Sequence, residues 1–290
     1  FCDINDKYLV VITNKGFIKV MDVHNPKKAK PLGSLCKFTH DFSSILSVRC
    51  IRTNCNGTRM AILADHVEGS LMVRHPDTRL HVFDRNKGGM WVHDFGDTNC
   101  FPTTVVWDNS DDRLLAVEVH KQRKGSGKTK TVSSDGTSSP FKSKPDTLSK
   151  TKTKSDDIPL ADIEVVTFFA TTDNGLLKQD SFPRKSPYGQ LIGIAVPKFY
   201  FRNIPNDRVK DHDYDLPKIL TKTMRDFVGL DNVDYVARVA LLDFSYNLTL
   251  GKLDDAYRAV KSINSTTIWE NMAQMCVKTQ RLDVAQVCLS

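Results

Sequence analysis

The pattern of apolar and polar positions changes once along the chain. Up to about Phe201, short apolar runs alternate with tight polar turns, and the period of two within the runs is that of β-strands. From about Asp215 onward, apolar residues recur with the 3.6-residue period of amphipathic helices. The sequence therefore predicts an all-β part over residues 1–205, a hinge over 206–216 and an all-α part over 217–290.

The β part contains an internal repeat. Ile51–Leu63 and Val105–Val117 align at an offset of 54 residues, and each copy has a strand, a polar turn, an arginine (Arg59 or Arg113) and a buried strand. Two more strands joined by a tight turn follow each copy, so each repeat is predicted to hold four antiparallel strands. Four-stranded units at this spacing are typical of β-propeller blades. About two and a half blades fit the chain, with Leu191–Phe201 as the closing strand region.

The predicted blades resemble degenerate WD40 blades. The third strand of such a blade often ends in Trp-Asp, where this chain has Met21-Asp22 and Phe83-Asp84. Its one Trp-Asp pair, Trp107-Asp108, ends a first strand instead. We expect Trp91 and Trp107 to pack within the blades rather than stack on a ligand, since large aromatic side chains mostly serve core packing.

The α part contains four apolar stripes. Gly251 is predicted to end the first helix, and Thr267 with Glu270 forms a predicted capping box ahead of the third. Gly251–Tyr257 and Gln280–Gln286 match at an offset of 29 residues. This offset is shorter than the roughly 34 residues of a tetratricopeptide unit, so the helix pairs are interpreted as degenerate members of that solenoid class. The stripes are Val233, Val236, Ala237, Ala240, Leu241, Phe244 and Leu248; Leu253, Ala256, Val260 and Ile263; Trp269, Met272, Ala273 and Cys276; and Leu282, Ala285, Cys288 and Leu289.

The net charge of +7 is concentrated in one segment. Lys121–Lys154 holds ten Lys or Arg and two Asp, a net +8, so the rest of the chain sums to −1. The segment is rich in Ser, Thr, Lys and Gly, and we expect residues 121–160 to be a disordered basic insertion between two strands. Electrostatic binding of phosphates or anionic lipid by this insertion stays open as an alternative.

Two clusters imitate ligand sites. Gly125–Thr129 reads GSGKT, but Gln122 stands where a phosphate-binding loop needs its first glycine. Residues 211–215 supply alternating acids, but Leu216 stands where a calcium loop needs glycine, so a solvated hinge is the prediction. No nucleophile, base and orienting group fall in one repeat. We therefore predict no catalytic, cofactor-binding or metal-ligating residues, and not an enzyme.

The seven cysteines are odd in number and scattered, and they form no CxxC motif. Most lie in apolar runs. They are interpreted as buried free thiols of a protein in a reducing compartment.

Two segments carry a more specific resemblance. Met224–Leu230 (MRDFVGL) and Trp269–Leu289 (WENMAQMCVKTQRLDVAQVCL) resemble the propeller-to-solenoid junction of the intraflagellar transport protein 140 family. The resemblance is close over Thr221–Ser290 and collinear through the blades. It implies a fragment that spans the end of the family's second propeller and the start of its helical repeats.

The resemblance also implies a function. It points to a non-enzymatic scaffold subunit of intraflagellar transport complex A, which supports retrograde ciliary transport, cilium assembly and entry of membrane cargo. The implied partners are the other complex A subunits, tubby-like adaptors and dynein-2-driven trains, with no nucleic acid, no stable membrane insertion and no cofactor. The implied location is the cilium, at axoneme and basal body, and the cytoplasm.

Two other readings stay open. A coatomer-like vesicle-coat subunit shares the propeller-solenoid plan, and a nucleic-acid or lipid binder would act through the basic insertion.

Overall fold

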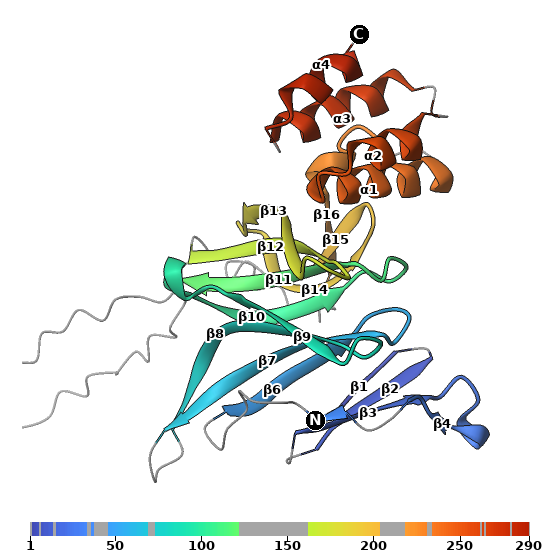
Figure 1. The fold of residues 1–290 in the computed structure, drawn as a ribbon. Helices are drawn as coiled ribbons and strands as arrows, with labels where there is room; N and C mark the ends of the chain where they lie inside the picture. The colour runs from blue at the N-terminus through green and yellow to red at the C-terminus, as the bar shows by residue number, and fades with distance from the viewer. Residues whose placement is uncertain are drawn as a thin grey trace, which may run out of the picture.

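The fold is a row of antiparallel β-sheets that leads into a stack of short helices (Figure 1). The computed structural model describes residues 2–5, 7–13, 16–33, 36–37, 46–68, 73–121, 162–203, 218–230, 234–261, 263, 265–278 and 280–289. The predicted basic insertion beyond Lys121, its GSGKT motif, the hinge at 206–216 and Val233 lie outside these residues.

Four sheets follow one another in chain order within the described ranges. In the second and third sheets, each strand pairs antiparallel with the next one along the chain. The first sheet holds β1 (Cys2–Ile4), β2 (Tyr8–Ile12), β3 (Phe17–Asp22), β4 (Lys30–Pro31) and β5 (Cys36–Lys37). The second sheet holds β6 (Leu46–Thr53), β7 (Arg59–Glu68), β8 (Val73–Asp84) and β9 (Gly89–Asp94), and the third holds β10 (Cys100–Trp107), β11 (Leu114–Lys121), β12 (Ile163–Ala170) and β13 (Leu176–Pro183). The fourth sheet holds β14 (Tyr188–Ala195), β15 (Lys198–Asn203) and β16 (Ile219–Thr223).

The predicted four-stranded repeat is confirmed by the second and third sheets. Both repeat copies begin in the first strand of a sheet and end in its second strand, β7 or β11. These middle strands are buried on both faces, because each sheet packs against its neighbours. The estimate of two and a half blades is too low, since β14–β16 form a sheet of their own. In the first sheet, β1 and β4 are too short to show the alternation of apolar and polar residues in the sequence.

The boundary between the two parts differs from the sequence-based expectation. Residues 217–290 are predicted to be helical, but Ile219–Thr223 forms β16 and pairs with β15 from Arg202↔Ile219 to Lys198↔Thr223. The segment is only five residues long, and a partner strand distant in sequence decides its conformation. The predicted closing region, Leu191–Phe201, is a hairpin of β14 and β15.

In the described ranges after residue 224, a short 3₁₀ turn, η4 (Arg225–Phe227), is followed by four helices. They are α1 (Tyr235–Thr249), α2 (Leu253–Val260), α3 (Thr266–Lys278) and α4 (Leu282–Leu289). Asp234 caps α1 by accepting a hydrogen bond from the Ala237 amide. Gly251, at φ +75°, follows α1, as predicted.

The details of the predicted stripes are only partly right. The capping box is misplaced, because α3 already begins at Thr266 and Thr267 lies inside it. Val236 is 73% exposed, and Leu282 and Leu289 are also exposed, whereas the other stripe residues of the described chain are buried or half-buried. None of these three side chains belongs to the described hydrophobic cluster that contains the helices.

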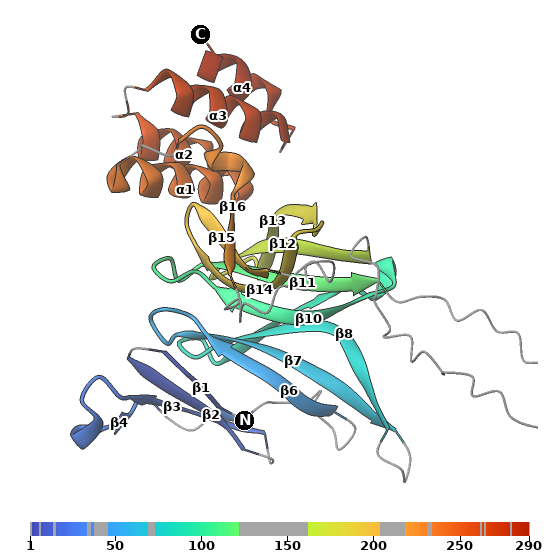
Figure 2. The ribbon, with the colours of Figure 1, turned by 180° about the vertical axis from the view of Figure 1, so that it is seen from behind.

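Among the residues that the structure describes, three hydrophobic clusters connect the sheets and the helices. One lies between the first and second sheets and one between the second and third. The last joins the third and fourth sheets to all four helices. Figure 2 shows the same succession from behind, with the helices stacked above the third and fourth sheets. Among the described helices, none is long and apolar enough to cross a membrane.

Candidate functional site

The junction between the sheets and the helices combines a shared hydrophobic cluster with buried polar contacts. Three residues of the η4 segment, Met224, Phe227 and Leu230, are buried in one hydrophobic cluster that contains side chains of the third sheet, the fourth sheet and all four helices. Phe227 is 2% exposed. The helices are therefore joined to the sheets by a shared core and not by a linker alone.

Asp226 is the polar centre of this junction. Its carboxylate is 4% exposed and pairs with the Lys278 ammonium of α3, with Oδ1 and Nζ 2.7 Å apart. The other carboxylate oxygen accepts a hydrogen bond from Gln179 Nε2 of β13 at 2.6 Å and lies 3.4 Å from the Ser245 hydroxyl of α1. One carboxylate thus connects the third sheet, α1 and α3.

The backbone of the same turn is also fixed. Asn271 of α3, itself buried, donates to the carbonyl oxygens of Asp226 at 3.3 Å and Val228 at 2.9 Å. A second carboxylate, that of Asp180 on β13, lies 3.4 Å from the Arg225 guanidinium and 4.0 Å from Lys278. Buried polar groups with several partners fix one arrangement of the elements that supply them.

The repeat arginines show how the blade contact changes at the junction. Arg59 pairs with Asp84 of its own sheet at 3.3 Å and donates to the Asp112 carbonyl of the next sheet at 3.3 Å. Arg113 occupies the equivalent place 54 residues later, but its Nη2 lies 2.7 Å from Asp243 of α1. A position that links two sheets in one repeat therefore links a sheet to a helix in the next.

Arg113 makes two further contacts that hold this link. It pairs with Asp111, and its guanidinium lies 4.5 Å from the ring centroid of Tyr246 of α1. Burial alone would lower the pKa of Arg113, but the hydrogen bonds and charges of Asp111 and Asp243 raise it above its ordinary value. Burial raises the pKa of the Tyr246 phenol. Both groups keep their ordinary protonation state over the physiological range.

Neighbouring sheets are linked by buried carboxylates as well. Glu118 of β11, 1% exposed, accepts hydrogen bonds from Arg184 at 2.6 Å and from the Leu191 amide at 2.8 Å. Asp108 accepts one from the Val196 amide at 2.8 Å. These contacts fix the fourth sheet against the third, and the fourth sheet carries η4.

The predicted packing roles of the tryptophans agree with their environment. Trp107 is 6% exposed, and its indole donates to the Arg52 carbonyl at 3.0 Å. Trp91 is half-buried against the cluster between the second and third sheets. Both side chains lie in contacts between sheets.

The cysteines are less buried than the sequence suggests. Six are described as free thiols, of which Cys276 and Cys288 are buried, three are half-buried and Cys2 is exposed. Burial and nearby carboxylates, Asp112 first, raise the pKa of Cys55 to about 11. Such a thiol is a poor nucleophile at neutral pH.

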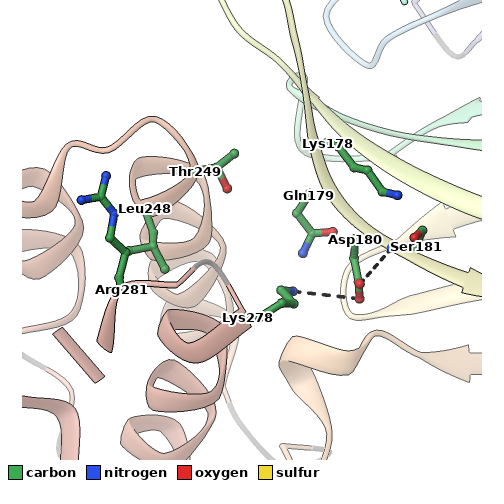
Figure 3. Close-up of a pocket in the computed structure, with 8 residues that line it drawn as sticks. All are labelled: Lys178, Gln179, Asp180, Ser181, Leu248, Thr249, Lys278 and Arg281. Carbon is green, nitrogen blue, oxygen red and sulfur yellow. Dashed lines mark hydrogen bonds and ion pairs between the residues drawn. The ribbon is translucent and has the colours of Figure 1, made fainter. Parts of the chain in front are cut away.

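A hollow of about 460 Å³ opens beside the junction (Figure 3). Lys278 lies between the strand β13 on one side and the ends of the helices on the other. Lys178, Gln179, Asp180, Ser181, Leu248, Thr249, Lys278 and Arg281 line it. Sequence reasoning names none of these as a site, although Lys278 lies inside the segment that carries the family resemblance. The pairing of Lys278 with Asp226 joins residues 52 positions apart and leaves no periodic signal.

Successive antiparallel sheets of three to five described strands, continued by short helix pairs, define a partial β-propeller joined to a helical-repeat region. Two family models match these two parts. The model described as the second β-propeller of IFT140 matches residues 1–100 and 96–203, and the model described as the TPR domain of IFT140 and IFT172 matches residues 251–290. Since the propeller model covers more than half of the chain, the chain belongs to the IFT140 family of intraflagellar transport proteins.

Solved structures add only a distant likeness. The β-propeller domain of Myceliophteria thermophila Cps50 (Swd1) is 10% identical at a TM-score of 0.34, with 76% of this chain and 54% of that chain covered. Pyrococcus horikoshii acylaminoacyl peptidase is 12% identical at a TM-score of 0.33, with 77% and 31% covered. This chain thus spans about half of the first and about a third of the second. Likeness at these scores implies nothing about catalysis.

Proposed function

We propose that this chain is part of a non-enzymatic scaffold subunit of intraflagellar transport complex A. In this role it supports retrograde ciliary transport, cilium assembly and the entry of membrane cargo into cilia. Its partners are the other complex A subunits, with tubby-like adaptors and dynein-2-driven trains as further contacts, and it acts at the axoneme and basal body and in the cytoplasm.

The observation that carries this proposal is the junction. A scaffold must hold its partners at fixed relative positions, and that requires its own domains to keep a fixed angle. Here a shared apolar core and the carboxylate of Asp226 connect the third sheet, the η4 turn, α1 and α3. The described contacts at the junction connect structural elements with one another. Such contacts favour a fixed orientation of the helices relative to the sheets.

The proposal also includes domain limits. We place the propeller blades at residues 1–205, with β16 as an added strand of the last sheet, and the solenoid after the η4 turn. β11 ends at Lys121 and β12 begins at Ile163, and these two strands pair with each other, so the basic segment falls in the sequence between two paired strands of one sheet.

The coatomer-like reading shares this architecture and differs in partners and location. The test is therefore affinity purification of the full-length tagged protein from ciliated cells, followed by mass spectrometry. Recovery of the other complex A subunits supports the proposal. Recovery of vesicle-coat subunits, or of chromatin proteins, would contradict it. Deletion of Lys121–Lys154 is the matched control, because a scaffold keeps its partners without this segment and a charge-driven binder loses them.

A further inference from the structure

Two hollows at the junction share Lys278. The hollow of Figure 3 extends from Lys278 to Lys178 and Arg281, which lie on opposite sides of it. A second hollow of about 270 Å³ lies between the η4 turn and α3, lined by Arg225, Gln274 and Val277 among others. Because Lys278 lines both hollows, we treat them together as the junction groove and define it by Lys178, Arg225, Val277, Lys278 and Arg281.

The junction groove carries an excess of positive charge. Its four cations face two carboxylates, Asp180 and Asp226, whose side chains are only 13% and 4% exposed. Arg225 and Lys278 already pair with these carboxylates. Within the part of the chain that the structure describes, Lys178 and Arg281 have no carboxylate partner. The chain outside Lys121–Lys154 sums to −1, so this excess is local.

One exposed aliphatic side chain lies among these cations. Val277 of α3 lines the second hollow together with Arg225 and Lys278, and it is 55% exposed. The groove therefore offers a protein segment an apolar contact beside positive charges that have no described carboxylate partner.

We propose that the junction groove binds an acidic protein segment that carries an aliphatic side chain, supplied by another subunit of the assembly. The carboxylates of the segment pair with Lys178 and Arg281, and its aliphatic residue packs on Val277. The cations are spread over two hollows and do not converge on one point, which suits a row of carboxylates better than a single phosphate. This inference rests on the proposed function, because it names the kind of contact that the scaffold makes.

The first test is charge reversal in the full-length protein. Lys178→Glu with Arg281→Glu removes the two cations without breaking a described ion pair. We expect the recovery of at least one partner subunit to fall by about tenfold, while circular dichroism and the melting temperature stay as in the wild type. Lys27→Glu with Lys28→Glu, on the exposed η1 turn (Pro26–Lys28) of the first sheet, is the matched control. Equal recovery from both double variants and the wild type would overturn the inference.

The second test identifies the bound segment. A photo-crosslinking benzoylphenylalanine at Val277 of the full-length protein in ciliated cells is expected to capture a peptide that is rich in Asp or Glu and contains an aliphatic residue. The same probe at Tyr257 of α2, which is 55% exposed, is expected not to capture that peptide. Capture of a neutral or basic peptide at Val277, or no capture at all, would contradict the proposed occupant.

Two further probes separate the sources of negative charge. Inorganic phosphate at constant ionic strength, and vesicles of phosphatidylcholine with a phosphoinositide, are expected not to displace the partner selectively. Selective displacement by either would make the groove a phosphate or lipid site and overturn the proposal. If the wild type recovers no complex A subunit, the proposed function fails. If it recovers them and the groove variants recover them equally, only this inference fails.

Discussion

Replacement of Asp226 by alanine should weaken the attachment of the helices to the sheets. The carboxylate is 4% exposed and pairs with Lys278, whose side chain is 22% exposed. The change leaves the Lys278 ammonium and Gln179 Nε2 without their described carboxylate partner. Removal of one partner of a buried ion pair costs roughly 3–5 kcal/mol. Because Lys278 keeps some contact with water and with Asp180, we expect the lower end of this range, about 3 kcal/mol.

Hydrogen–deuterium exchange of the full-length protein measures this loss where it occurs. A loss of about 3 kcal/mol should speed exchange of the α3 amides by about a hundredfold, since each 1.4 kcal/mol is about a factor of ten. Asp255→Ala is the control, because Asp255 and Arg258 form an exposed pair at 47% and 71% exposure, worth less than about 1 kcal/mol. Addition of Lys278→Met to Asp226→Ala should restore part of the loss.

Exchange of the α3 amides at the wild-type rate in Asp226→Ala would refute this reasoning. It would mean that Asp226 and Lys278 do not contribute to the attachment.

Three further predictions concern the sheets and the turn. Phe227→Ala removes a side chain that is 2% exposed and should lower the free energy of unfolding, measured in urea, by about 3–5 kcal/mol. Val228→Ala, at a side chain that is 58% exposed, should change it by no more than about 0.5 kcal/mol. Equal effects of the two changes would contradict the shared core. Arg113→Lys should cost about 2 kcal/mol because an ammonium cannot make the forked contacts to Asp111 and Asp243; thermal melting at the wild-type temperature would argue against this link. Burial first, with a smaller contribution from Lys178, lowers the pKa of His93 below 6.5 in the folded protein. The unfolded chain therefore takes up the proton more readily, and the stability of the fold should decrease as the pH drops below 6.5. His93→Gln should flatten the dependence of the melting temperature on pH, and an unchanged dependence would refute the assignment.

The repeat in the β part could be read from the sequence because each blade repeats its own local pattern. Ile51–Leu63 and Val105–Val117 carry the same order of strand, turn, arginine and strand, and the structure places them at equivalent positions in two sheets. Parts of the first sheet carry a weaker sequence signal. Its strands β1 and β4 have three and two residues, which is too short for a periodic signal.

The junction could not be predicted in the same way. Asp226 and Lys278 are 52 positions apart in the sequence, and Arg113 and Asp243 are 130 positions apart. Such contacts depend on how whole elements pack against one another and leave no local pattern in the sequence. The helix-predicted range that contains β16 shows the same effect, because β15 supplies the partner that makes Ile219–Thr223 a strand. The apolar stripes predicted the helices α1 and α4 correctly. They did not predict the exposure of Val236, Leu282 and Leu289, because exposure depends on what packs against each face of a helix.

The measurement that tests the central claim most directly is live imaging of the full-length tagged protein in ciliated cells, together with a second tag on another complex A subunit. The proposed scaffold role predicts that both signals move together along the axoneme in trains and return together to the ciliary base. A tagged protein that stays on Golgi membranes, or that never moves with the second subunit inside the cilium, would contradict it.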